Sequence, residues 1–147
     1  MKTPELNKDQ FDHLFPFHLL ADKNLMILQA GRSIRKLLPD LIGRFALDAF
    51  QILRPKLSSV SFDDLRHFEE LIIIQAKGNK PILLRGQIEY IEKEDQILFI
   101  GNPWFSSMDQ VIENNLNLHD FAISDPMIDL LHVLKRSEEH TSELQSP

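Results

Sequence analysis

Residues 71–104 read LIIIQAKGNKPILLRGQIEYIEKEDQILFIGNPW and contain three apolar runs separated by two polar turns. The middle run alternates: Ile82, Leu84, Ile88 and Tyr90 share one face, and Arg85, Gln87 and Glu89 share the other. A period of two predicts a strand with one solvated face. Leu71–Ala76 and Gln96–Gly101 are predicted strands on either side, with Asn102-Pro103 ending the last one. We therefore expect three consecutive antiparallel strands.

The segments before and after this core add two strands and several helices. Apolar runs at 17–20 and 25–30, joined by Ala21-Asp22-Lys23-Asn24, predict a hairpin. Helices are expected at 4–14 with Thr3 as N-cap, at 33–38, 47–53, 61–70 and 108–115, and from Ser124-Asp125-Pro126 onward. This order predicts an α+β fold, a five-stranded antiparallel sheet with helices on one face, an N-terminal helix and a C-terminal signalling helix. A PAS domain has the same element order.

Composition restricts the classes of function. The 147 residues carry a net charge of −6 and scattered basic residues, which argues against nucleic-acid binding. The chain contains no cysteine, so disulfides and thiolate metal sites are excluded. It has neither an apolar run of the ~20 residues that cross a bilayer nor a signal-peptide pattern at its start. We expect a cytoplasmic domain without membrane contact.

The last twelve residues, 136–147, read RSEEHTSELQSP and differ in composition from the rest of the chain. The first eleven match the conceptual translation of a common sequencing adapter. We interpret this segment as an artefact, expect it to be disordered, and expect the natural sequence to continue beyond Lys135. The alternative is a natural disordered tail. The expected organisation is then a helical cap over 1–14, a PAS-like domain over 15–123 and the start of a signalling helix over 124–135.

Six short strings, in order along the chain, resemble the haem-NO-binding-associated (HNOBA) family. They are Phe15-Pro16-Phe17-His18, Ile27-Leu28-Gln29-Ala30-Gly31, Leu53-Arg54-Pro55, Arg85-Gly86-Gln87-Ile88-Glu89-Tyr90, Ile97 to Trp104, and Leu116 to Phe121 followed by Ser124-Asp125-Pro126. Ser124 stands where the family usually has histidine, and Arg85 where it has lysine. The HNOBA domain is the PAS-like region of soluble guanylate cyclases and of bacterial nitric-oxide signalling proteins.

The resemblance implies a non-catalytic regulatory and dimerisation domain in nitric-oxide signalling. Such a domain relays an input through a coiled coil to a guanylate cyclase, a histidine kinase or a diguanylate cyclase. Because Met1 lies only ~15 residues before the first string, we expect a haem-NO-binding sensor to act in trans. The expected partners are that sensor and a second subunit, in a homo- or heterodimer formed through the C-terminal helix.

No arrangement of residues predicts a catalytic site, a cofactor or a metal site. The sequence lacks HExxH, GxSxG and phosphate-loop patterns. His18 lies in a predicted strand and is a weak candidate ligand for haem, and the alternative is a buried histidine that fixes the strand. A second function is therefore a PAS sensor that binds a small apolar molecule or haem.

Two features predict interaction surfaces. Met127, Leu130 and Leu134 have a–d–a heptad spacing, and Leu131 extends the apolar stripe. They predict a dimerising helix, and the alternative is a helix packed on its own sheet. Trp104 lies at the predicted rim of the sheet, where it serves as a partner contact or as a cap on the edge of the core.

Overall fold

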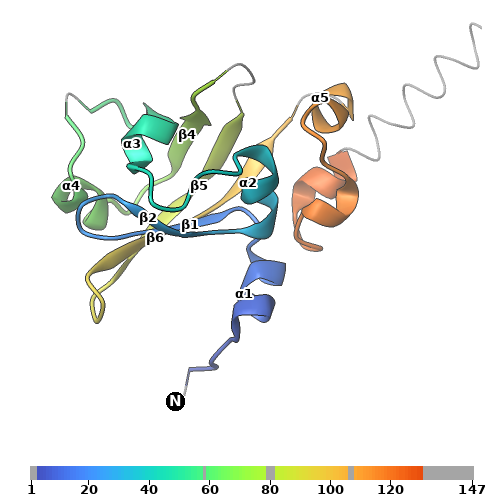
Figure 1. Ribbon diagram of the computed structural model, residues 1–147. Coiled ribbons are helices and arrows are strands. Elements are labelled where there is room, and N and C mark those ends of the chain that lie inside the picture. The colour runs from blue at the N-terminus through green and yellow to red at the C-terminus, as the bar shows by residue number, and fades with distance from the viewer. Residues whose placement is uncertain (1–2, 58, 79–81, 106–107, 131–147) are drawn as a thin grey trace, which may run out of the picture.

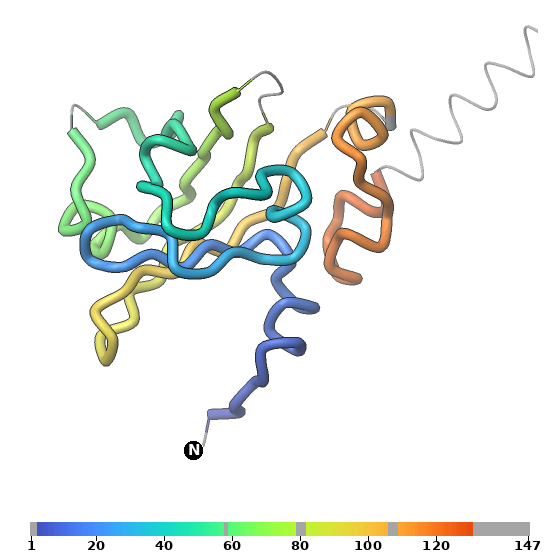
Figure 2. The backbone as a smooth tube through the Cα atoms, in the orientation of Figure 1, coloured from blue at the N-terminus to red at the C-terminus, as the bar shows by residue number. Residues whose placement is uncertain are grey.

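The computed structural model describes residues 3–57, 59–78, 82–105 and 108–130. Six strands form one antiparallel sheet in the order β2-β1-β6-β5-β4-β3. The strands are β1 (His18–Ala21), β2 (Ile27–Ala30), β3 (Phe50–Arg54), β4 (Ile72–Ala76), β5 (Leu83–Ile91) and β6 (Gln96–Trp104). The sheet therefore joins the early hairpin to the four later strands through the pairing of β1 with β6. Figure 2 traces the backbone through both parts.

Short helices surround the sheet (Figure 1). They are α1 (Lys8–Leu14), α2 (Arg32–Leu37), α3 (Ala46–Ala49), α4 (Phe62–Arg66), α5 (Met108–Glu113) and the 3-10 turn η1 (Leu118–Asp120). Residues 126–130 are also helical. Helices α2 and α3 lie on one side of the sheet and α1 extends on the other, whereas α5 and residues 118–130 lie beside α2 at one end.

The core occupies one face of the sheet. The side chains buried there include those of Leu19, Ile74, Leu84, Ile88 and Phe99. They share this face because Leu19 and Ile88 both pair with Phe99, and Ile74 pairs with Leu84. Arg85, Gln87 and Glu89 are exposed on the opposite face, which confirms the alternation predicted for residues 81–91.

The prediction of five strands is wrong, because a sixth strand replaces a predicted helix. Residues 47–53 were expected to be helical, but the helix ends at Ala49 and β3 follows. Phe50 pairs with Ala76 and Ile52 pairs with Ile74. This pairing places both apolar side chains on the core face of the sheet. A seven-residue helix is only marginally stable by itself, so burial in the sheet favours the strand.

Several predicted boundaries are also wrong, among them the end of α4, which is expected at residue 70 but lies at Arg66. Strand β6 does not end at Asn102-Pro103 but continues to Trp104, since Asn102 pairs with Arg85 and Pro103 with Leu84. The first helix begins at Lys8 instead of Pro4, and its N-cap is Asn7 instead of Thr3. The Asn7 side chain accepts a hydrogen bond from the Gln10 backbone amide, and the Gln10 side chain accepts one from the Asn7 backbone amide. This reciprocal cap determines where the helix starts.

Candidate functional site

The segment that leads from the sheet to the C-terminal helix is anchored at Asp120. The Asp120 carboxylate accepts from Lys36 Nζ at 2.8 Å and from the Asn117 amide at 2.8 Å, and Arg32 lies 3.9 Å away. Ser33 Oγ donates to the Asp120 carbonyl. Asp120 is buried, whereas the two cations are about a third exposed. This ion cluster holds η1 against α2.

The helix over residues 126–130, which we call the outgoing helix, begins at a buried carboxylate. Asp125 is 6% exposed, and its Oδ1 accepts from the Met127 amide at 2.9 Å. Burial raises the pKa of Asp125, and the hydrogen bond from the Met127 amide opposes that rise. Pro126 occupies the first helical turn, where a missing N–H costs nothing. The predicted helix start is confirmed.

The apolar stripe of the outgoing helix is partly packed against its own domain. Met127 is 3% exposed and belongs to the core, and Leu130 is half-buried against the same cluster. Leu131, Leu134 and the tail over 136–147 lie outside the described residues. The first two members of the stripe thus contact the core of this chain, which agrees with the intramolecular alternative at those two positions. A role for the stripe in dimerisation stays a prediction.

Trp104 lies at the end of β6 and is 50% exposed. The Arg85 guanidinium stands over its ring, 6.0 Å from the centroid. A groove of about 130 Å³ runs beside this pair and is lined by Asn102, Pro103, Asp125, Pro126 and Met127 as well as by Trp104 and Arg85. The structure therefore brings two predicted interface residues, Trp104 and Met127, to the same groove.

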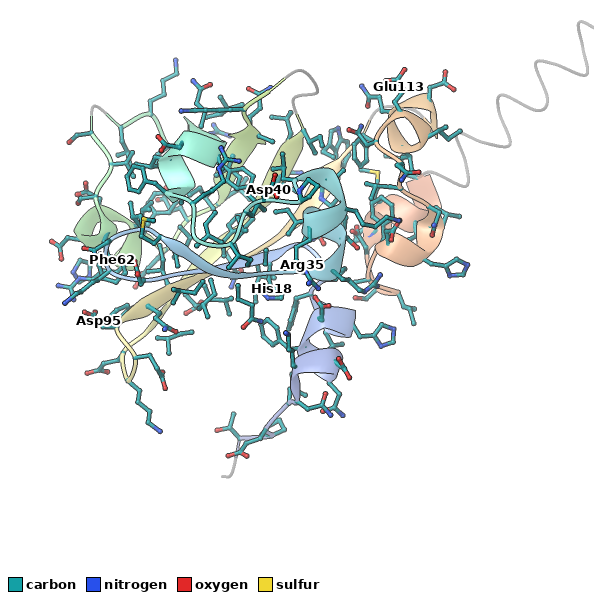
Figure 3. All side chains as sticks on the ribbon, viewed as in Figure 1. His18, Arg35, Asp40, Phe62, Asp95 and Glu113 are labelled. Atoms are coloured by element: carbon teal, nitrogen blue, oxygen red, sulfur yellow. The ribbon has the colours of Figure 1, made fainter. Side chains whose placement is uncertain are left out.

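His18 is buried at the junction of α1 and the sheet (Figure 3). Its Nδ1 bonds with the Phe15 carbonyl at 2.8 Å, and its Nε2 lies 3.0 Å from the Gln29 amide nitrogen. A neutral ring with the proton on Nδ1 satisfies both contacts. Burial lowers the pKa of His18 and so favours that neutral form. This environment is that of a histidine that fixes a strand.

A small apolar cavity of about 70 Å³ lies between the core face of the sheet and helices α3 and α4. Its lining is entirely apolar and includes Leu19, Ala46, Leu65, Ile74 and Phe99. His18 is the neighbour of Leu19 on β1, so its side chain points to the opposite face. The candidate haem ligand and the cavity are therefore on different sides of the sheet.

The described part of the chain contains neither a candidate metal site nor a helix that could span a membrane. Within residues 3–57, 59–78, 82–105 and 108–130, no group of three or more His, Cys, Asp or Glu side chains could hold a metal ion. Over the same ranges, no helix has the length and apolar character needed to cross a membrane.

The six strings lie on β1, β2, the end of β3, β5, β6 and the segment that contains η1 and the start of the outgoing helix. Comparison with known families gives two overlapping matches, over residues 4–80 and 69–145, to the family described as Heme NO binding associated. The chain belongs to the HNOBA family. The matches include all six strings on which the resemblance was based, so that interpretation is confirmed.

The relatives of this HNOBA chain include guanylate cyclases and guanylate cyclase subunits. It is 30% identical over 134 residues to guanylate cyclase soluble subunit alpha-2 of Rattus norvegicus, which covers 84% of this chain and 18% of that protein. It is 28% identical over 137 residues to soluble subunit beta-2 of the same species, with 86% and 20% covered. The head-specific guanylate cyclase of Drosophila melanogaster is 25% identical over 133 residues, with 82% and 20% covered. The chain spans only a fifth or less of each of these relatives.

Sequence reasoning missed two residues that hold the segment over 117–130 in place, Asn102 and Asp120. Asn117 and Asp120 form a reciprocal capping box, since the Asn117 side chain accepts from His119 and Asp120 bonds back to Asn117. The Asn-x-x-Asp spacing is the signal that predicts this turn. No local signal predicts that Lys36 meets Asp120, because 84 residues separate them.

Proposed function

We propose that this chain is a non-catalytic regulatory domain of a nitric-oxide-linked signalling protein. It relays an input through the outgoing helix to an output domain, a guanylate cyclase or a kinase, that follows in the full-length protein. The observation that carries this proposal is the placement of Met127 and Leu130 on the domain core at the start of an apolar stripe. A helix that begins on the core transmits a displacement of the core along its axis.

The proposed partners follow from the same helix and from the family. The relatives include proteins described as alpha and beta subunits of soluble guanylate cyclase. We assign this chain a homo- or heterodimer through its C-terminal helix, and a separate haem-NO-binding sensor that acts on it in trans. Trp104, with its exposed ring, is the proposed contact at the sheet rim. The proposed compartment is the cytoplasm.

The dimer is tested with a chain that carries its natural continuation beyond Lys135. Leu130→Asp places a charge in the proposed seam, and we expect the dimer dissociation constant to rise at least about tenfold. Ile128→Asp is the matched control, because Ile128 is also half-buried against the core but lies outside the a–d spacing. Sedimentation equilibrium measures both. Equal dimer affinity for Leu130→Asp and wild type contradicts the proposal.

A second candidate function is supported by the cavity on the core face. Its entirely apolar lining favours a small apolar ligand over haem, since dry apolar cavities bind such molecules and His18 faces away. Xenon is a suitable probe, followed by the chemical shifts of the methyl groups around the cavity. Ala46→Leu fills the cavity and should abolish the shifts. Shifts that persist in this variant, or that are absent in wild type, remove this candidate.

A further inference from the structure

Strand β6 lies between the two parts of the sheet, and its end lies beside the first turn of the outgoing helix. It is hydrogen-bonded to β1 on one side and to β5 on the other. Near its end, the Asn102 side chain lies against Asp125. With its nitrogen turned toward that carboxylate, the Asn102 amide donates to Asp125 Oδ2 at 3.2 Å and to the Gly101 carbonyl at 3.2 Å. The opposite orientation would place the amide oxygen against acceptors only.

The same carboxylate holds the first turn of the helix. Asp125 Oδ2 accepts a hydrogen bond from the Asn102 side-chain amide, and Asp125 Oδ1 accepts one from the Met127 backbone amide at 2.9 Å. The backbone of Asp125 is fixed as well, because its amide donates to the Ala122 carbonyl and its carbonyl accepts from Ile128. Asp125 is thus bonded to β6 through one oxygen and to the helix through the other. A buried carboxylate needs such donors, because desolvation disfavours its charge.

We propose that Asn102 and Asp125 form a polar joint that sets the direction in which the outgoing helix leaves the sheet. Asn102 is a positioning residue, since it acts on the helix only through Asp125. Opening the joint frees the first turn of the helix while leaving the sheet folded. The regulatory meaning of the joint rests on the proposed function, but the joint itself is tested without any partner or output domain.

The competing account is that apolar packing alone holds the helix. Met127 is buried in the core, and its side chain contributes to that anchor whatever the polar joint does. The two accounts differ at Asn102, which is itself exposed on the sheet. If packing alone is sufficient, then changing Asn102 leaves the helix where it is. If the joint holds the helix, changing Asn102 weakens the protection of the Met127 amide in the first turn of the helix.

The experiment exchanges the two side chains. Asn102→Asp replaces the donor with a second carboxylate that faces the carboxylate of Asp125. The two groups repel each other, so the hydrogen bond that forms the joint is lost. The double variant Asn102→Asp with Asp125→Asn restores a donor facing a carboxylate, and the side-chain oxygen of the introduced asparagine still caps the Met127 amide. Gln51→Glu, which adds the same charge to an exposed amide on β3, is the matched control. Hydrogen exchange of the Met127 amide is the readout, with Ile88 on β5 as the internal reference.

In Asn102→Asp we expect exchange at Met127 to accelerate about tenfold or more, as the loss of a hydrogen bond to a charged group requires. Exchange at Ile88 should stay unchanged. The double variant should return Met127 to within about twofold of wild type, and the control should leave both amides unaltered. Trp104, the one tryptophan in the chain, lines the groove against Pro126 and Met127. Its acrylamide quenching should rise in Asn102→Asp and recover in the double variant.

Three results overturn the proposal. Unchanged exchange at Met127 in Asn102→Asp shows that packing alone holds the helix. Equal acceleration at Met127 and Ile88 shows that the variant weakened the whole sheet. Failure of the double variant to restore protection shows that the pair does not act as a unit. None of these results bears on dimer affinity, so a failure of the proposed function in the Leu130→Asp test is seen separately.

Discussion

Replacing Asp120 should detach η1 from α2, and the contacts of its carboxylate determine how much stability is lost. In Asp120→Ala the Asn117 amide loses a charge-assisted acceptor at 2.8 Å, a loss of about 1.5–2 kcal/mol. Lys36 loses a partner at 2.8 Å but is over a third exposed, so solvent compensates for much of that bond and about 1 kcal/mol is lost. Arg32, at 3.9 Å, adds little. The free energy of unfolding should therefore fall by about 3 kcal/mol.

Urea denaturation followed by circular dichroism measures this loss. At this chain length, about 3 kcal/mol corresponds to a decrease of about 9 °C in Tm. Asp120→Asn keeps an acceptor for the Asn117 amide and loses only the charge, so we expect a smaller cost of about 1 kcal/mol. Asp40→Ala removes an exposed carboxylate from the loop after α2 and should cost less than about 0.5 kcal/mol. A cost for Asp120→Ala no larger than that of Asp40→Ala refutes the reasoning.

Three further changes test other parts of the fold. Because the folded state lowers the pKa of His18, the unfolded state binds its proton first, so stability should fall as pH drops below about 6.5; His18→Gln should weaken this dependence in urea unfolding at about pH 7.5 and about pH 5. In Gly86→Ala the new Cβ would collide with the Ile100 carbonyl on β6, so the free energy of unfolding should fall by about 3 kcal/mol; a loss below about 1 kcal/mol would show that the strands separate easily. Ser61→Ala removes the acceptor for the Asp64 amide at the start of α4 and should cost about 1 kcal/mol in thermal unfolding; no change in Tm would show that the capping box contributes nothing.

Elements with a strong local signal were predictable from the sequence. The alternation at 81–91 and the apolar runs beside it predicted β4, β5 and β6 because burial on one face determines side-chain direction along a strand. The caps at Ser61 and at Asp125-Pro126 predicted two helix starts that the structure contains. In each case the residues that decide the structure are within a few positions of one another.

Elements that depend on a distant partner were not predictable. Residues 50–54 carry a pattern compatible with a short helix, and only the edge of β4 makes them a strand. Proline at 103 usually ends a strand, yet β6 continues past it, since the pairing of β5 with β6 extends to Leu83 and Trp104. The candidate site has the same property, because Asn102 contacts Asp125 across 23 positions of sequence and Lys36 contacts Asp120 across 84.

The central place of β6 has a consequence for synthesis of the chain on the ribosome. Strand β1, which pairs Leu20 with Leu98, is translated early but receives its partner only after nearly eighty further residues have been added. At ordinary rates of elongation this delay lasts several seconds, during which the hairpin of β1 and β2 presents an unpaired edge. The sequence separation between these strands also predicts slow folding. The unfinished chain is therefore most exposed to edge-to-edge aggregation in the interval between synthesis of β1 and synthesis of β6.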